Sequence, residues 1–279
     1  MLLGVDVGGT FTDAVLVNNG IIIKQAKVKT TQEEVLQGIL QALDIVLSGN
    51  ELDAISRVVV SSTIVTNALT EGKTEPVFLA VMAGPGMSTK GRFPTEPYLA
   101  EGYVDHRGQI IKKASVNEKI VEAMAAGKAV AAVSGKFAVR NQKNEQDLRV
   151  KLKETGFKKI FMGSEISGEL NFVRRTNSAY FSAAVYNKFK EFIGQVEDSV
   201  RSRGITAQVQ ILKADGGTIP LAAALEQPVE AVFTGPAASV LGIEALDAPS
   251  VNAISLDVGG TTTDIAFWSC GSPLLANRG

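Results

Sequence analysis

The pattern of apolar and polar residues predicts that the chain begins with three strands joined by tight turns. The apolar runs LLGVDV, DAVLVNN and GIIIKQAKV are separated by Gly8–Gly9 and by Asn19–Gly20. Such pairs supply the backbone angles that short hairpin turns need. Over roughly 31–48 the apolar residues recur every three or four positions, which predicts a helix. A capping box of Thr31 and Glu34 is expected to begin this helix.

A second stretch continues the alternation of strands and helices. RVVVSS predicts a strand, TIVTNALTEG a helix and PVFLAVMAG another strand. The order βββαβαβ predicts one sheet with an antiparallel hairpin at its edge and parallel strands in its centre. Residues 84–112 are rich in glycine and proline, so a loop or insertion with a short strand near 103–112 is expected.

The remaining pattern predicts a β-α-β-α-β segment and then a last helix. Its parts are AVAAVSG, NEQDLRVKLKETG, KKIFMGS, a long helix over roughly 176–203, and QVQILKA. The stretch GPAASVLGIEALDA then forms a helix that leads to a second strand pair. Three regions follow: 1–112 as a first lobe, 113–232 as a middle α/β segment, and 233–279 as the start of a second lobe.

The most informative feature of the sequence is an internal repeat. Residues 6–13 read DVGGTFTD and residues 257–264 read DVGGTTTD. Across the windows 4–17 and 255–268, 7 of the 14 positions are identical. One copy is typical of an ordinary hairpin turn. Two copies with matching apolar flanks predict two phosphate-binding hairpins that face one nucleotide.

The residue types of the repeat explain this chemistry. Glycine lets the backbone approach a ligand closely, successive N–H groups form an anion-binding concavity, and threonine adds a neutral donor. Asp6 and Asp257 end apolar strands, and a bare carboxylate there would repel phosphate. We therefore expect both to act in catalysis by holding Mg²⁺, directly or through water. The expected phosphate-binding residues are Gly8, Gly9, Thr10, Thr12, Gly259, Gly260, Thr261 and Thr263.

Composition narrows the class of protein. The chain has 279 residues, 45% of them hydrophobic, and a net charge of −1, which is typical of a soluble globular protein of about two domains. This charge disfavours nucleic-acid and anionic-membrane partners. No apolar run approaches the ~20 residues of a membrane span, and the N-terminus does not resemble a signal peptide, so a cytoplasmic location is expected. The single Cys270 excludes an internal disulfide and a cysteine-based zinc cluster, and His106 is expected to be solvated.

The two DVGG hairpins, the second reached through a helix of small residues, resemble the actin-like ATPase superfamily. Within it the chain is most similar to the ATP-binding component of the hydantoinase/oxoprolinase family. This resemblance implies an α/β fold in which a first actin-like (ribonuclease H-like) lobe has a mixed sheet. It also implies that Gly235, Pro236 and Ala237 open the helix between the lobes. The segments that carry the resemblance are 4–17, 61–69, 174–186, 213–242 and 255–267.

The resemblance also implies a function. Members of this family use ATP to phosphorylate the carbonyl oxygen of a cyclic amide such as a hydantoin or 5-oxoproline, which water can then open. A second hydrolase subunit or domain often completes the ring opening, and some relatives carboxylate ketones. The family's adenosine-binding motif would lie beyond Gly279. We therefore expect an N-terminal fragment that is inactive by itself.

One departure from the family pattern limits what can be carried over. The family commonly has a His-Gly-Thr-Thr element before Thr-Asn-Ala, and here Val60 stands in place of the histidine. Thr63, Thr66 and Asn67 either line a substrate pocket or cap a helix. The run of Asp215, Gly216 and Gly217 is either a substrate-facing loop or a strand-to-helix turn.

Three further points complete the expectations. Arg174 and Arg175 are predicted to be surface charges. Two other functions stay open: a small-molecule kinase, which would need a base beside its acceptor hydroxyl, and a nucleotide-switched activator or assembly factor. A Rossmann dehydrogenase is disfavoured because these glycines open onto a strand, whereas the dinucleotide fingerprint opens onto a helix.

Overall fold

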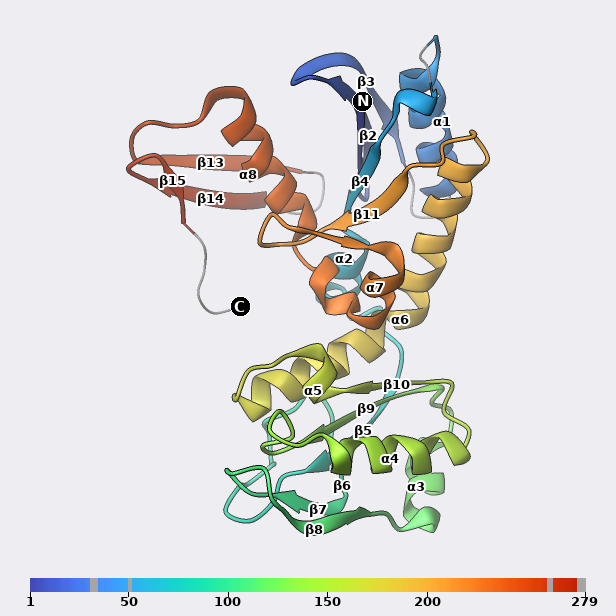
Figure 1. The fold of residues 1–279 in the computed structure, drawn as a ribbon, viewed down its shortest axis with the longest axis vertical. Helices are drawn as coiled ribbons and strands as arrows, with labels where there is room; N and C mark the ends of the chain where they lie inside the picture. The colour runs from blue at the N-terminus through green and yellow to red at the C-terminus, as the bar shows by residue number, and fades with distance from the viewer. Residues whose placement is uncertain (31–34, 50–51, 260–262, 275–279) are drawn as a thin grey trace. The chain divides into compact units, whose positions relative to one another are not determined.

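The computed structural model describes residues 1–30, 35–49, 52–259 and 263–274 (Figure 1). The chain divides into two compact units. The first unit is Met1–Thr70, Asn187–Leu225 and Glu230–Gly279, and the second is Glu71–Tyr186 with Glu226–Val229. The predicted regions 1–112, 113–232 and 233–279 are continuous stretches of sequence. The two units, in contrast, each combine separate stretches of the chain that contact one another. Those three regions stay a prediction.

A six-stranded mixed sheet forms the centre of the first unit. Its order is β12-β11-β4-β1-β2-β3, in which β1 runs antiparallel to β2 and parallel to β4. The predicted antiparallel hairpin edge and parallel centre are therefore confirmed. The strands are β1 (Leu2–Val7), β2 (Phe11–Asn18), β3 (Ile21–Lys29), β4 (Arg57–Ser62), β11 (Gln208–Leu212) and β12 (Thr218–Pro220).

Helix α1 (Val35–Leu47) covers one face of this sheet. Strand positions that point to it, such as Leu3 and Leu16, are buried together with Ile39 and Leu43 of the helix. A Cβ at Gly38 would lie 2.8 Å from Thr30 Oγ1, so glycine allows the helix to approach the sheet. The predicted capping box of Thr31 and Glu34 lies outside the described residues. The other helices of this unit are α2 (Ile64–Thr70), α7 (Leu221–Glu226), α8 (Thr234–Asp247), and the short η1 (Leu52–Ala54) and η2 (Pro228–Ala231).

The second copy of the repeat forms the same kind of hairpin as the first. Strands β13 (Ala253–Val258) and β14 (Thr263–Ser269) pair antiparallel, and β15 (Ser272–Pro273) extends the sheet. Asp257 lies opposite Asp264, as Asp6 lies opposite Asp13 in the β1–β2 hairpin. The predicted equivalence of the two hairpins is confirmed in their strand register. Gly260 and Thr261 lie outside the described residues.

The second unit is a parallel sheet with helices on both faces. Its order is β10-β9-β5-β6. Alternate residues of β5 enter two different cores, because Phe78 packs with Leu148 while Leu79 packs with Phe172. The elements are β5 (Val77–Met82), β6 (Tyr98–Leu99), β7 (Glu101–Val104), β8 (Ile110–Ser115), α3 (Glu118–Ala125), β9 (Val130–Gly135), α4 (Lys143–Glu154), β10 (Lys159–Met162) and α5 (Gly163–Ile166). Helix α6 (Phe172–Arg201) belongs to this unit up to Tyr186 and to the first unit from Asn187.

Two sequence predictions about the fold are wrong. The run βββαβαβ does not form one sheet, since β5 is a central strand of the second unit and β11 lies beside β4. An unbroken apolar run indicates burial on both faces but does not indicate which sheet receives the strand. The stretch near 103–112 holds most of the β7–β8 hairpin, not one short strand.

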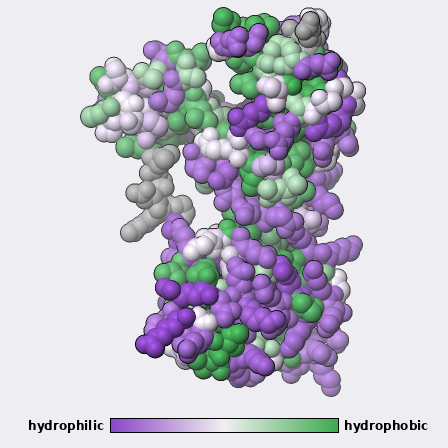
Figure 2. Space-filling view, in the orientation of Figure 1, coloured by the Kyte–Doolittle hydropathy of each residue, from purple (hydrophilic) through white to green (hydrophobic). Residues whose placement is uncertain are grey.

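Smaller expectations can also be compared with the structure. His106 lies exposed in the turn between β7 and β8, as predicted. Cys270 is exposed in the turn after β14. Among the described helices, none combines the length and the apolar character that crossing a membrane requires. Apolar side chains reach the surface around β13–β15, at the left of the space-filling view (Figure 2).

Candidate functional site

The two hairpins contribute to one cavity of about 190 Å³ in the first unit, which we call the tip cavity. Both hairpins contribute aspartates and glycines to its lining. The other walls come from β3, from Thr63 just before α2, and from α8. The predicted residues Asp6, Gly8, Gly9 and Thr10 are therefore brought together with Asp257 and Gly259. The full lining is Asp6, Gly8, Gly9, Thr10, Phe11, Asp13, Lys27, Thr63, Gly235, Ser239, Asp257, Gly259 and Asp264.

The glycine turn of the first hairpin is closed tightly. Gly8 N donates to Phe11 O at 2.9 Å, and a Cβ on Gly8 would lie 2.9 Å from that same oxygen. Only glycine fits without a shift of the backbone. Thr12 points to the other side of the sheet, where its hydroxyl shares a 2.6 Å hydrogen bond with Thr30 in the core. Thr263 is exposed and pairs with Val258. Neither Thr12 nor Thr263 therefore lines the tip cavity.

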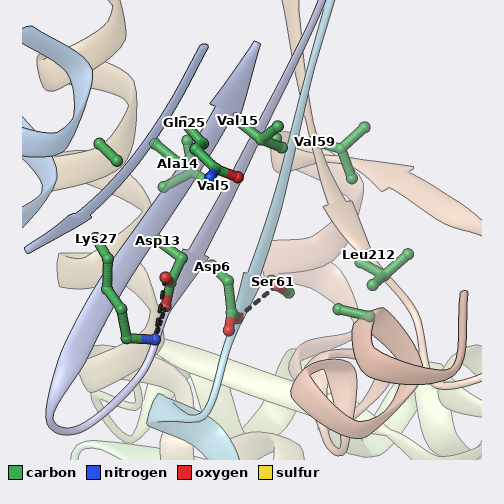
Figure 3. Close-up of a pocket in the computed structure, with 13 residues that line it drawn as sticks. Val5, Asp6, Asp13, Ala14, Val15, Gln25, Lys27, Val59, Ser61 and Leu212 are labelled. Carbon is green, nitrogen blue, oxygen red and sulfur yellow. Dashed lines mark hydrogen bonds and ion pairs between the residues drawn. The ribbon is translucent and has the colours of Figure 1, made fainter. Parts of the chain in front are cut away.

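Each hairpin presents two aspartates directly opposite one another. Asp6 faces Asp13, and Asp257 faces Asp264. Like charges in directly opposed positions destabilise a strand pair. A second shared feature is a serine that holds the first aspartate of each pair. Ser61 Oγ donates to Asp6 Oδ1 at 2.5 Å (Figure 3) and Ser239 Oγ donates to Asp257 Oδ2 at 2.8 Å.

The carboxylates influence one another's protonation. Burial raises the pKa of Asp6, the hydrogen bond from Ser61 lowers it, and the charges of Asp13 and Asp257 raise it again, with a net rise above its ordinary value. Burial and the charge of Asp257 likewise raise the pKa of Asp264. Burial and the neighbouring carboxylates thus both disfavour the charged forms of Asp6 and Asp264, and a bound cation would favour those charged forms.

The two hairpins differ in the cations around them. Lys27 Nζ lies 3.1 Å from Asp13 Oδ2 (Figure 3) and 4.9 Å from the centre of the Phe11 ring. In the part of the chain that the structure describes, no lysine or arginine forms an ion pair with Asp257 or Asp264.

This donor set fits Mg²⁺ held partly through water. Among the described residues, no group of three or more His, Cys, Asp or Glu side chains is close enough to enclose a metal ion. Mg²⁺ commonly uses one or two carboxylates together with waters and substrate phosphates. Asp6 and Asp257, one from each aspartate pair, could hold the ion in this way.

The junction between β4 and α2 answers one open question about helix capping. Ile64 N donates to Ser62 Oγ at 3.1 Å, so Ser62 satisfies a free amide at the start of α2. Thr63 lines the tip cavity and accepts a hydrogen bond from Asn67 Nδ2. Thr66 accepts a hydrogen bond from Phe233 N at 3.0 Å. Of these three substrate candidates, only Thr63 is grouped with the tip cavity.

The Asp215–Gly217 segment is a tight turn between strands. It joins β11 to β12, so the interpretation as a strand-to-helix turn is wrong. Asp215 Oδ1 accepts a hydrogen bond from Gly217 N at 2.9 Å, and Lys213 Nζ binds Asp215 Oδ2 at 2.9 Å. Gly216 has φ of +82°, a conformation that favours glycine. The residue types in this segment are those that its turn requires.

Sequence reasoning missed several residues of the tip cavity. Asp13 and Asp264 could have been found, because the repeat holds a second acid in both copies and a hairpin places it opposite the first. Ser61 could also have been found, since β4 runs parallel to β1 and puts Ser61 beside Asp6. Ser239 gives no such signal, because its contact with Asp257 depends on how α8 packs.

A larger cavity of about 680 Å³ lies on the sheet face that α1 leaves uncovered (Figure 3). It shares Asp6, Asp13 and Lys27 with the tip cavity, and Val15 and Val59 form part of its apolar wall. The three shared charged residues therefore lie between the apolar wall of this larger cavity and the tip cavity.

The prediction that Arg175 is a surface charge is wrong. Arg175 is buried in the second unit, where its guanidinium donates to Gly135 O at 2.8 Å and to Glu169 O at 2.6 Å. Glu145 is also buried and accepts hydrogen bonds from Gly135 N and Ser164 N. Burial raises the pKa of Glu145. These two residues join the ends of β9 and β10 to α4 and α6.

With this geometry in place, comparisons with known proteins identify the family. Residues 2–156 match the family model for the hydantoinase/oxoprolinase N-terminal region, and residues 175–278 match the model for hydantoinase/oxoprolinase. The chain is an α/β protein that belongs to the hydantoinase/oxoprolinase family.

Curated relatives are similar over almost the whole chain. An uncharacterised protein of Methanocaldococcus jannaschii is 26% identical over 99% of this chain and 45% of its own length. The acetophenone carboxylase gamma subunit of Aromatoleum aromaticum is 25% identical over 95% of this chain and 42% of its own length. The chain thus spans less than half the length of either relative.

Solved structures confirm the fold. A nucleotide-free acetone carboxylase structure, described in terms of ATP-dependent acetone carboxylation, has a TM-score of 0.82 at 19% identity and covers 98% of this chain and 44% of that chain. The ATP-dependent caprolactamase of Pseudomonas jessenii has a TM-score of 0.71 at 20% identity and covers 96% and 43%. The predicted α/β class with mixed sheets is therefore confirmed.

Proposed function

We propose that the polypeptide containing this chain is an ATP-dependent enzyme that phosphorylates the carbonyl oxygen of a cyclic amide and so prepares it for hydrolysis. The observation that carries this proposal is the tip cavity, where the two hairpins present Gly8, Gly9 and Gly259 together with two aspartate pairs to the same space. Membership of the hydantoinase/oxoprolinase family supports it.

The residues of the cavity suit the handling of a polyphosphate. Backbone N–H groups near Gly9, Thr10 and Gly259 would donate to phosphate oxygens. Asp6 and Asp257, each held by a serine hydroxyl, would bind Mg²⁺ directly or through water. Mg²⁺ would neutralise the charge of the polyphosphate as it is transferred. Catalysis would then depend on the position of these charges more than on any covalent step with the protein.

The chemistry balances with ATP and water as the co-reactants. The amide carbonyl oxygen attacks the γ-phosphorus, the bond to the bridging oxygen breaks, and ADP leaves. Water adds to the carbon of the resulting phosphorylated imidate, and the ring C–N bond then breaks, so that the nitrogen takes up a proton and leaves as an amine and the carbon becomes an acyl phosphate. A second water attacks the acyl carbon, and phosphate departs with the former carbonyl oxygen, leaving a carboxylate. Amide substrates are supported by the ATP-dependent caprolactamase, and partner chains are supported by the name of the acetophenone carboxylase gamma subunit. The absence of a family histidine at Val60 is consistent with ring opening by a second subunit or domain.

An isotope experiment tests this proposal in the full-length protein. The carbonyl oxygen of 5-oxoproline, hydantoin or caprolactam is labelled with ¹⁸O, and the products with Mg-ATP are followed by ³¹P NMR. We expect phosphate release that depends on the amide, with one ¹⁸O in the phosphate. A stable phosphorylated acceptor would favour a kinase. Turnover that no amide stimulates would favour a nucleotide-switched activator, and either result would overturn the hydrolase proposal.

A further inference from the structure

An unusual pair of hydrogen bonds ties the start of α8 to the end of β4. Thr234 is 1% exposed. Its hydroxyl accepts from Ser62 N at 2.9 Å and donates to Ser62 O at 2.9 Å, although the two residues are 172 positions apart. One side chain thus satisfies both backbone groups of the last residue in β4, as a neighbouring strand would.

The residue before Thr234 is held in a conformation that it would not adopt freely. Phe233 has φ of 58° and ψ of 29°, in the left-handed region that bulky residues avoid. Its side chain is 54% exposed, so burial of the ring does not explain this conformation. Its amide donates to Thr66 Oγ1. Such a conformation persists when surrounding contacts impose it, and it often marks a functional position.

The same junction is joined to the tip of the first hairpin. Ser62 Oγ donates to Val7 O at 3.0 Å, and Thr63 N donates to that carbonyl at 3.2 Å. Val7 directly precedes the Gly8–Gly9 turn. Hydrogen bonds therefore connect the glycine turn of the first hairpin to the first residue of α8.

Helix α8 carries this connection to the second hairpin. Gly235, next to Thr234, lines the tip cavity. Ser239 lies five positions after Thr234, or about 7.5 Å along the helix axis, and holds Asp257. The place where α8 begins therefore determines where the second pair of aspartates lies relative to the first pair.

We propose that Thr234 is a positioning residue, which fixes α8 on β4 and thereby sets the second hairpin opposite the first. Thr234 itself is not grouped with the tip cavity, so it would act through the helix and not by contact with a ligand. The structural part of this proposal is independent of the activity. Its kinetic part rests on the proposed function.

A distance measurement tests the structural part. Within residues 1–279 Cys270 is the single cysteine, and it is exposed beside the second hairpin, while an Asn18→Cys variant adds an exposed site at the end of β2. Spin labels at these sites report the distance between the hairpins by pulsed EPR. We expect Thr234→Val to broaden the distance distribution at least twofold, and Thr234→Ser to keep the original width. An unchanged width in folded Thr234→Val protein would overturn the proposal.

Two further variants control this measurement. Thr70→Val also removes a threonine hydroxyl, but that hydroxyl is exposed and bonds only to α2's own carbonyls, so the width should stay unchanged. If circular dichroism shows that Thr234→Val does not fold, Thr66→Val replaces it, since it removes only the acceptor of Phe233 N. Broadening in Thr66→Val supports the junction's role, and an unchanged width contradicts it.

The kinetic part uses the full-length enzyme. Misplacement by about 1 Å can reduce turnover roughly 10²-fold, so we expect Thr234→Val to lower kcat for phosphate release about 10–100-fold, while Thr234→Ser stays within about threefold of the wild type. An unchanged kcat alongside a broadened distance would overturn the kinetic part of the proposal. A wild-type enzyme that shows no amide-dependent turnover would instead overturn the proposed function and leave the distance result standing.

Discussion

The two hairpins hold the same residues on one face and differ in what covers the other face. Leu3 lies opposite Leu16 in the first hairpin, and Ile254 lies opposite Phe267 at the equivalent place in the second. Leu3 is 1% exposed, whereas Ile254 is 64% exposed. In both hairpins the aspartates occupy the face away from these apolar residues.

This difference separates two requirements on the repeat. Both copies have the same aspartates, each with a serine partner, although only the first copy lies in a large sheet. The sheet therefore does not explain these residues, whereas the cavity that both copies line does. The apolar face of the first hairpin packs under α1. In the second hairpin α8 packs on the face that carries the aspartates. Ser239 of α8 donates a hydrogen bond to Asp257, and Glu244 of α8 accepts a hydrogen bond from Trp268 Nε1. None of the described residues covers the opposite, apolar face, and exposed apolar patches commonly mark contact surfaces.

The largest expected effect tests whether the two aspartates are equivalent in function. Asp6→Asn and Asp257→Asn should each lower kcat for Mg-ATP hydrolysis by the full-length enzyme roughly 10²–10³-fold, because each removes a preorganised charge. Phosphate release at saturating ATP measures this. The exposed Asp53→Asn is the matched control and should retain full activity. A loss confined to one hairpin would show that the repeat is structural in the other.

A second prediction concerns the apolar faces. Leu3→Ala should lower the free energy of unfolding by about 2–5 kcal/mol, since it leaves a cavity in a packed core. Ile254→Ala removes a similar side chain from an exposed position and should change it by about 0.5 kcal/mol or less. Urea unfolding of both variants measures the contrast. Equal losses would mean that the apolar face of the second hairpin is covered in solution.

A third prediction concerns the serine partners. Ser61→Ala and Ser239→Ala should each lower turnover roughly 10–100-fold, because a hydrogen bond to a charged group contributes about 1.5–3 kcal/mol. The bond from Ser61 lowers the pKa of Asp6, so Ser61→Ala should also move the acidic limb of the pH–rate profile to higher pH. A pH–rate profile for each variant, compared with Ser56→Ala as an exposed control, measures both effects. An unshifted acidic limb in Ser61→Ala would show that Asp6 does not control that limb.

The smallest expected effect concerns the stability cost of opposed charges. The pKa of Asp264 is raised in the folded protein, so its stabilising contribution is present below its ordinary value of 3.8 and is lost as the pH rises through the raised value. Asp264→Asn should therefore raise the free energy of unfolding at pH 7 by about 0.2–1 kcal/mol, and by less near pH 4. Asp13→Asn should gain less, because it also loses the ion pair with Lys27. Urea unfolding at both pH values measures this, and a larger gain for Asp13→Asn would contradict the role given to Lys27.

Local pattern predicted most of the elements and half of the site. Alternation and turn residues located the strands of both hairpins, and the repeat by itself predicted that Asp6 and Asp257 share one cavity. The predictions that were wrong or missing concern features that depend on long-range packing. The apolar run of β5 predicts that the strand is buried, but it does not predict which sheet the strand joins. The charge of Arg175 suggested a surface position, whereas backbone carbonyls accept its hydrogen bonds in the core. Ser239 could not be assigned because a helix face gives no indication of its partner.

The insertion of the second unit between β4 and β11 has a consequence for synthesis on the ribosome. Arg57 on β4 binds Gln210 on β11, 153 positions later. At about 5–20 residues per second, roughly 8–30 s separate the emergence of these two strands. The segment Glu71–Tyr186, which forms most of the second unit, emerges complete within that interval. The inserted unit therefore has time to fold before its host sheet is finished, and until then the β4 edge is open to incorrect pairing.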